Sequence, residues 1–191
     1  PRSTRRGAPH LAISMDDLER IMVDGWPPIE RAELGGWLLR AAAGFTGKKG
    51  QTCIVLGATA AHPSIVLAGL GRDSTARAYE EAGAAAALAL SREPAASLIV
   101  ADPAHAAHAA LGAALRSYRF DRYRTKETAD DKPRLATLHV LTSDPEAARA
   151  AYAPLAATRD GVFLTRDLAS EPPNVLYPAE LADRCRALSA L

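Results

Sequence analysis

Short apolar runs alternate with helical stretches along the chain. The apolar runs predict strands at His10–Ile13, Ser97–Ala101 and Leu135–Leu141, and buried strands at Thr52–Leu56 and Ser64–Leu70. The stretches between and after them predict helices at Met15–Val23, Ile29–Ala43, Ser74–Leu90, Asp102–Tyr118 and 144–170. Strands that alternate with helices of this length are typical of an α/β domain with a mostly parallel sheet between two helical layers.

Residue pairs that start helices mark the second half of the chain. Asp102-Pro103 and Asp144-Pro145 each place an N-cap carboxylate before a proline in the first helical position. Pro154 lies inside the last long helix, where it removes a hydrogen bond to the Ala150 carbonyl. We therefore expect this helix to kink or split.

The C-terminal stretch resembles the beginning of another unit. Glu171-Pro172-Pro173-Asn174 breaks the long helix, and Tyr177-Pro178 opens a new one. The new helix has an apolar face that no later residue of the sequence covers, made of Leu181, Cys185 and Leu188. We divide the chain into a disordered leader (1–8), an α/β domain (9–142), a connecting helix (143–170) and the start of a further domain (171–191).

The overall composition limits the classes of function. There are 23 lysines and arginines against 22 aspartates and glutamates, for a net charge of +1. This balance argues against a protein that is basic throughout and binds nucleic acid or membranes with its whole surface. Cys53 and Cys185 match neither a disulfide framework nor a zinc motif, and no apolar run is long enough to span a membrane. These features predict a reducing, cytoplasmic setting.

Two kinds of motif, a histidine pair and glycine-containing turns, suggest ligand sites without meeting the requirements for them. His105 and His108 are spaced for one helix face, but arginines share that face, so we expect a solvated surface rather than a metal site. Gly69-Leu70-Gly71 follows a strand, where a phosphate-binding turn would lie, but Ser74 stands where the third glycine is needed. The loop Gly44–Thr52 lacks the Gly-Lys-Ser/Thr pattern and precedes its strand. We interpret both glycine segments as ordinary turns.

A third segment, Arg116–Lys126, mixes basic and aromatic residues and is a candidate nucleic-acid footprint. Neighbouring acids such as Asp121 and Glu127 dilute its charge. A segment that anchors this domain to another domain, or to a second copy of the chain, explains it at least as well. The sequence contains no Gly-x-Ser-x-Gly, His-Glu-x-x-His or Cys-x-x-Cys motif. We therefore predict no catalytic, cofactor-binding or metal-binding residue.

Two segments resemble a known family. Leu115–Tyr123 resembles the segment that closes a helix in the N-terminal domain of leucyl (cytosol) aminopeptidases. Gly161–Pro178 is similar to the entry of that family into its catalytic domain. The chain departs from the family pattern at Ser170, where the family usually has Asn, and at Pro154 in the connecting helix.

The resemblance implies a two-domain metallo-aminopeptidase, typically hexameric and cytoplasmic. Its N-terminal domain has a macro-like fold and does not carry the catalytic site. Its C-terminal domain holds two divalent metals, zinc or manganese, that activate a water molecule toward the first peptide bond. The family's metal ligands and its Asn-Thr-Asp-Ala-Glu-Gly-Arg-Leu signature would follow Leu191, so none can be assigned to this sequence. We expect a catalytically silent, architectural chain that ends in a truncated catalytic domain. The alternative is a free-standing macro-like module that binds ADP-ribose or another nucleotide, or serves as an interaction module.

Overall fold

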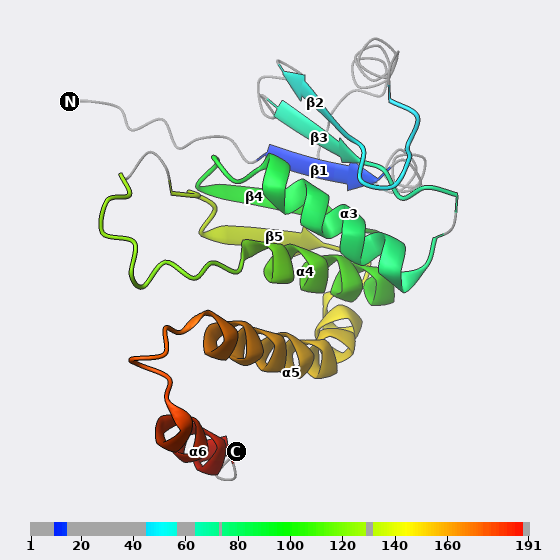
Figure 1. Ribbon diagram of the computed structural model, residues 1–191. Helices are drawn as coiled ribbons and strands as arrows, with labels where there is room; N and C mark the ends of the chain where they lie inside the picture. Colours follow the sequence, from blue (N-terminus) through cyan, green and yellow to red (C-terminus); the bar gives the residue numbers. More distant parts are fainter. Residues whose placement is uncertain (1–9, 15–44, 57–63, 73, 129–131, 189–191) are drawn as a thin grey trace, which may run out of the picture.

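The computed structural model describes residues 10–14, 45–56, 64–72, 74–128 and 132–188 (Figure 1). The expected leader (1–8) and the helices expected at 15–23 and 29–43 lie outside these residues. The helical layer that those two helices would form, and the macro-like fold, therefore stay predictions.

A five-stranded sheet organises the described residues. Its strands are β1 (His10–Ser14), β2 (Thr52–Leu56), β3 (Ser64–Ala68), β4 (Ala95–Ile99) and β5 (Thr137–Leu141). The helices are α3 (Ala76–Ala89), α4 (Pro103–Ser117), α5 (Pro145–Ser170) and α6 (Pro178–Ala187). The strand order is β2-β3-β1-β4-β5, with β2 and β3 antiparallel and the other described pairs parallel. The predicted α/β class with a mostly parallel sheet is confirmed.

The predicted helix starts are mostly correct. The Asp102 carboxylate accepts a hydrogen bond from the His105 backbone N–H at 2.8 Å, and Asp144 caps α5 in the same way. Helix α3 begins two residues after the predicted start at Ser74, and the hydroxyl of Thr75 caps it by accepting a hydrogen bond from the Ala78 N–H.

Two strand boundaries also differ from the prediction. β4 begins and ends two residues before the predicted 97–101, and β5 begins two residues after the predicted Leu135. The ladder between the two strands sets these limits, since Ala95 pairs with Thr137 and Ile99 pairs with Leu141. Hydrophobicity alone does not show which residues pair across strands.

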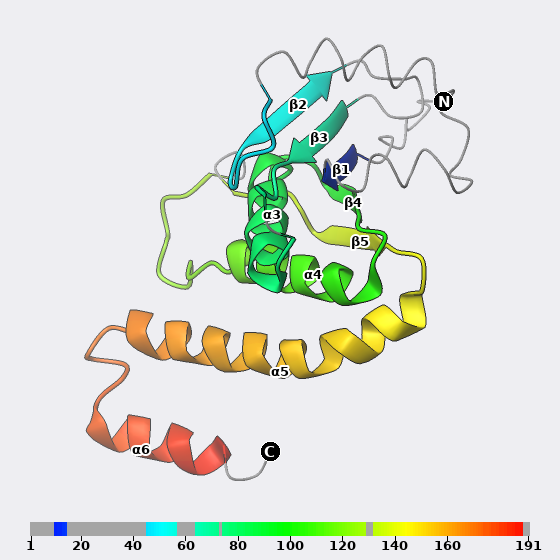
Figure 2. The same cartoon turned by 90° about the vertical axis from the view of Figure 1, so that its right-hand side faces the viewer.

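Pro154 does not split α5, which continues as one helix of 26 residues. Figure 2 shows this helix curved rather than broken. The proline removes a single backbone hydrogen bond, and α5 is held by its packing against α4. Of the two expected outcomes, a kink or a split, the split was therefore wrong.

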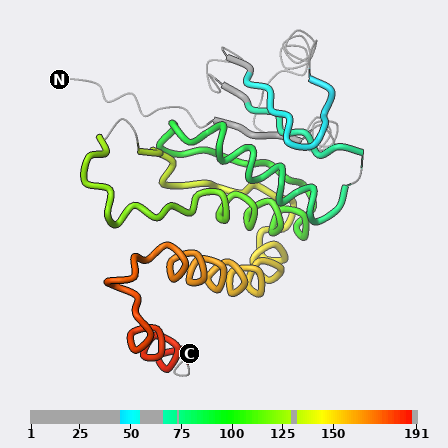
Figure 3. The backbone as a smooth tube through the Cα atoms, viewed as in Figure 1, coloured from blue at the N-terminus to red at the C-terminus, as the bar shows by residue number. Residues whose placement is uncertain are grey.

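The core lies between the sheet and one face of α3 and α4. It combines strand residues such as Val66 and Leu98 with small helical residues such as Ala82 and Ala109. Helix α5 packs against α4 on the side away from the sheet, and α6 follows beyond it (Figures 2 and 3). The described residues thus form a sheet, a layer of α3 and α4, and an outer helix.

Two glycines allow α3 and α4 to pack with their backbones in contact. A Cβ atom on Gly112 would overlap the Glu80 carbonyl oxygen of α3, and one on Gly83 would overlap the Ala109 carbonyl oxygen of α4. Because both obstructing groups are backbone, a side chain at either position requires the helices to move apart.

We predict that Gly112→Ala lowers the free energy of unfolding by about 1–3 kcal/mol, since overpacking outweighs the gain in helix propensity. Gly161→Ala is the matched control, because a Cβ atom at Gly161 in α5 meets no atom within 4 Å. This control should be neutral or stabilising by up to about 1 kcal/mol. Urea unfolding followed by circular dichroism measures both. Equal effects of the two substitutions would contradict the close packing.

Candidate functional site: the junction around Glu171

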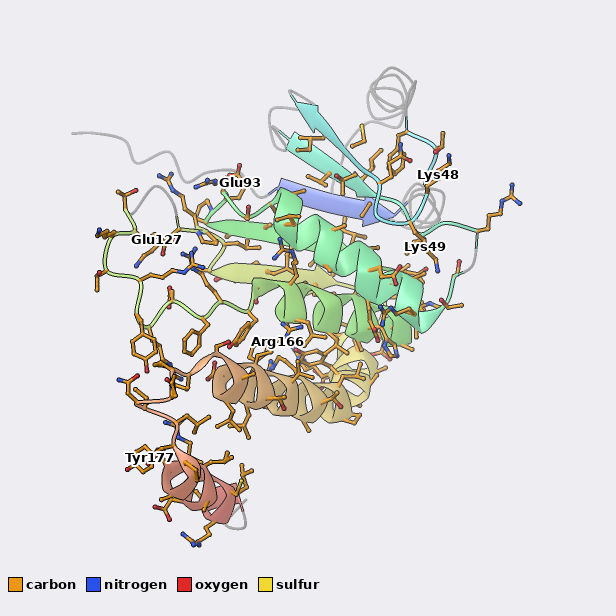
Figure 4. The ribbon with its side chains drawn as sticks, in the orientation of Figure 1. Lys48, Lys49, Glu93, Glu127, Arg166 and Tyr177 are labelled. Carbon is orange, nitrogen blue, oxygen red and sulfur yellow. The ribbon has the colours of Figure 1, made fainter. Side chains whose placement is uncertain are left out.

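The C-terminal ends of α4 and α5 are joined by side chains from both segments. The Arg166 guanidinium of α5 donates a hydrogen bond to the Leu115 carbonyl at 2.8 Å and lies over the Tyr118 ring, 5.3 Å from its centroid. Figure 4 shows Arg166 between the two helices. The Tyr118 ring also packs against Phe163, with centroids 5.1 Å apart. The Tyr118 hydroxyl donates to Asp167 at 2.7 Å.

Glu171 lies at the centre of this junction. It directly follows α5, and its side chain is only 1% exposed. Its carboxylate accepts hydrogen bonds from Arg122 Nη1 at 2.7 Å and from the Tyr123 hydroxyl, and Arg184 of α6 lies 3.7 Å away. Arg122 also donates to Asp167 at 3.0 Å. We call Tyr118, Arg122, Tyr123, Asp167 and Glu171 the clasp.

The electrostatics of the clasp favour an ionised Glu171. The hydrogen bond from Tyr123, together with the charges of Arg122 and Arg184, holds the pKa of this carboxyl below its ordinary value despite the opposing effect of burial. The same hydrogen bond raises the pKa of the Tyr123 hydroxyl. The clasp is therefore complete when the glutamate is charged and the tyrosine is neutral.

Tyr118 is the second tyrosine of the clasp. Burial, followed by its hydrogen bond to Asp167, raises the pKa of its hydroxyl, while a hydrogen bond with the Ser170 side chain lowers it. Ser170, the position at which the sequence departs from the aminopeptidase pattern, thus contacts the clasp.

Sequence reasoning singled out both segments of the clasp but missed Glu171 as its centre. A carboxylate at a helix C-terminus opposes the helix dipole, so Glu171 at the end of α5 was a signal for nearby cations. The arginines came from the segment considered as a nucleic-acid footprint. In the structure Arg122 binds Asp167 and Glu171, while Arg119 and Arg124 face Glu127.

The histidine pair was expected on a solvated face. In the structure it is half-buried against α3. His108 Nδ1 lies 2.9 Å from Glu80 Oε1, and the His105 ring stacks on Tyr79 with centroids 4.2 Å apart. The expected surface was wrong because the alanines and Gly112 on this side of α4 let α3 approach closely.

The backbone amides of the glycine turn after β3 already donate hydrogen bonds to other backbone groups of the chain. The Gly69 N–H donates to the Gln51 carbonyl at 2.8 Å, and the Gly71 N–H donates to the Gly47 carbonyl at 2.7 Å. Gly71 has a φ of 85°, and a Cβ atom on Gly69 would overlap the Lys48 carbonyl oxygen. These amides are therefore used to hold the 47–51 loop, which takes the place a phosphate would need.

The described residues provide neither a metal-ligand group nor a membrane-spanning helix. No three His, Cys, Asp or Glu side chains in this part of the chain are arranged to hold a metal ion. None of its helices is long and apolar enough to cross a membrane.

Comparison with known proteins assigns the family. The sequence profile of the cytosol aminopeptidase family, N-terminal domain, matches residues 31–127. The chain belongs to this family. Its curated relatives include probable cytosol aminopeptidases of Caulobacter vibrioides, 41% identical over 82% of this chain, and Gluconobacter oxydans, 40% identical over 85%. The alignments cover 34% of each relative, so the chain spans about a third of their length.

Solved structures show the same fold as this cytosol aminopeptidase N-terminal domain. A mutant of tomato leucine aminopeptidase superposes with a TM-score of 0.74 at 24% identity, covering 100% of this chain and 41% of that protein. The bottromycin maturation enzyme BotP in complex with Mn gives 0.69 at 26% identity, covering 96% of this chain and 36% of that protein.

The lowered pKa of Glu171 predicts how the clasp responds to pH. A carboxyl whose pKa is lowered by folding stabilises the folded state above its unfolded pKa, and this contribution is lost as pH falls through the folded pKa. Glu171→Gln should therefore lower the urea midpoint at pH 7 and have little effect near pH 3. Urea unfolding of both proteins at each pH measures the difference. A deficit that is equally large at both pH values would contradict an ionised Glu171.

Proposed function

We propose that this chain is the non-catalytic N-terminal part of a cytosol aminopeptidase. In this proposal residues 9–142 form a macro-like domain, 143–170 form the connecting helix, and 171–191 begin the catalytic domain. The observation that carries it is the clasp, in which a buried glutamate at the end of α5 is held by Arg122 and Tyr123 from the end of α4. Such an arrangement fixes the direction in which the chain leaves the domain.

The clasp gives this chain an architectural role. Arg122 binds carboxylates on either side of the end of α5, so the helix cannot rotate about its axis without breaking both bonds. Arg184 connects Glu171 to α6. On α6 the apolar side chains of Leu181 and Leu188 are 40% and 43% exposed. We propose that the catalytic domain covers this face.

The chemistry of the family would reside in that catalytic domain. Two divalent metals, zinc or manganese, polarise the scissile carbonyl and activate water in the aminopeptidases that this sequence resembles. The donors in the described part of the chain do not fit such a pair: the carboxylates nearest to the two histidines, Glu80 and Asp102, are already their partners. No step of hydrolysis is therefore assigned to a residue of this chain.

We also propose the cellular setting and the partners. The relatives are named as cytosol aminopeptidases, and the exposed thiol of Cys185 fits a reducing compartment. A cytoplasmic homo-oligomer, hexameric as in the family, would bring together several copies of the whole enzyme, and the peptide substrate would contact the catalytic domain. The glycine turn that motivated a nucleotide-binding module is occupied by the chain's own backbone.

A chimaera tests the proposal. This chain replaces the matching third of the Caulobacter vibrioides relative, and release of leucine from a chromogenic leucine amide is measured with Mn²⁺ or Zn²⁺. We expect activity from the chimaera and none above the blank from residues 1–191 alone, because the metal ligands come from the catalytic domain. Leucine release by residues 1–191 alone would overturn the proposal.

The chimaera carrying Glu171→Gln shows whether the clasp matters for assembly. We expect it to lose both its activity, measured by hydrolysis, and its oligomeric state, measured by light scattering. The reason is that α5 is no longer held in one orientation. The chimaera carrying Arg77→Ala is the control, since Arg77 pairs with Glu81 on the exposed surface of α3. An inactive unsubstituted chimaera that is folded and oligomeric would also contradict the proposal.

A further inference from the structure

Two cavities adjoin on the side of α4 that faces β5 and α5. The larger cavity has a volume of about 450 Å³ and lies between α4, β5 and the first turns of α5. The smaller has a volume of about 330 Å³ and lies where α3 and α4 end. Ala87, Ser117 and Leu135 line both, so the two cavities share a wall. The smaller cavity adjoins the clasp, because Tyr118 lines it.

The two cavities differ in chemistry. The larger one, which we call the apolar compartment, is lined mainly by small and aliphatic side chains, including Ala110, Ala114, Leu138 and Val140. The smaller one, which we call the arginine compartment, is lined by Arg116, Arg119 and Arg124 beside Ser91 and Leu88. A ligand that fills both must therefore have an apolar end and an anionic end.

The positive charge of the arginine compartment is only partly neutralised. Arg119 and Arg124 both face the single carboxylate of Glu127, which Figure 4 places on the side of the sheet where β4 and β5 begin. Asp121 forms a second ion pair with Arg119, 3.6 Å from its Nε, so two carboxylates face three arginines. Arg116 forms no ion pair with any residue in the described part of the chain.

An unsatisfied donor points the same way. Among the described residues, two buried side-chain atoms have no hydrogen-bond partner: the donor Nε of Arg119 and the acceptor Oε2 of Glu127. Buried donors are nearly always satisfied in folded proteins, and an unpaired one costs free energy. An anionic group in the arginine compartment would add negative charge and hydrogen-bond acceptors beside Arg116 and Arg119.

We propose that the two compartments together bind a small amphipathic anion. Its carboxylate or phosphate head would lie against Arg116 and Arg119, and its aliphatic tail would lie along Ala110 and Ala114. A bound tail would also contact Ala148 and Tyr152 of α5, so the ligand would hold α5 against α4. The site is concave and small, which suits a metabolite rather than a nucleic-acid strand.

Calorimetry on the whole chain tests the proposal with defined probes. Octanoate and octyl phosphate carry both ends, inorganic phosphate carries the head alone, and octanol carries the tail alone. We expect at least one of the two amphipathic probes to bind more than tenfold tighter than either fragment, and the tighter one identifies the head group. Hexanoate should bind about 16-fold more weakly than octanoate, since it lacks two methylenes and each buried methylene contributes about fourfold in affinity.

Two variants address the compartments separately. Arg116→Ala should weaken the better amphipathic probe about tenfold by removing a charge-assisted hydrogen bond. Ala114→Leu should weaken it by filling the apolar compartment with all charges retained. Arg77→Ala is the control for the loss of one arginine, because Arg77 lies near the opposite end of α3 from the arginine compartment. Circular dichroism confirms that each variant is folded.

The proposal is overturned if the amphipathic probes bind no tighter than phosphate or octanol. It is also overturned if Arg116→Ala and Ala114→Leu, both folded, bind the amphipathic probe as tightly as Arg77→Ala does. These results do not depend on aminopeptidase activity, so they leave the architectural proposal untouched.

Discussion

The position of α5 depends on one buried carboxylate. Glu171 ends the helix with a negative charge where the helix dipole is also negative, and its side chain is almost fully enclosed. Both features are unfavourable unless cations and donors surround the group. Arg122, Tyr123 and Arg184 supply them from two other segments. The need to satisfy this charge therefore ties the end of α4, the end of α5 and the start of α6 together.

The clasp requires a rigid support, which the packing of α3 and α4 provides. Gly83 and Gly112 bring the two helices into backbone contact, and alanines fill most of the remaining interface with the sheet. Because α4 is fixed in this way, its C-terminal segment presents Tyr118 and Arg122 in defined positions. The family assignment shows which part of a cytosol aminopeptidase this arrangement belongs to: the chain matches the N-terminal domain and covers about a third of its relatives. In the proposed function, the domain acts by setting the direction in which α5 and α6 leave it.

Much of the fold could be predicted from the sequence, because apolar runs and the pairs Asp102-Pro103 and Asp144-Pro145 are local signals. The same local patterns could not show which residues pair across strands, so β4 was placed two residues too late. They also could not show that α3 covers the histidine face of α4, which depends on the close approach at Gly112. The two residues that donate hydrogen bonds to Glu171, Arg122 and Tyr123, lie more than 40 residues away in the chain. Hydrophobic periodicity does not reveal such a long-range contact. The family resemblance indicated both segments, 115–123 and 161–178, but not that they contact each other.

A double-mutant cycle between Tyr123 and Glu171 tests the central claim most directly. Hydrogen exchange of the α5 amides is measured for Tyr123→Phe, Glu171→Gln and the double variant at pH 7. If the two side chains act through one hydrogen bond, each single variant exchanges faster than the unsubstituted chain, and the double variant exchanges little faster than Glu171→Gln alone. Independent effects that multiply in the double variant, or unchanged exchange in Glu171→Gln, would contradict the claim that this carboxylate holds α5 in place.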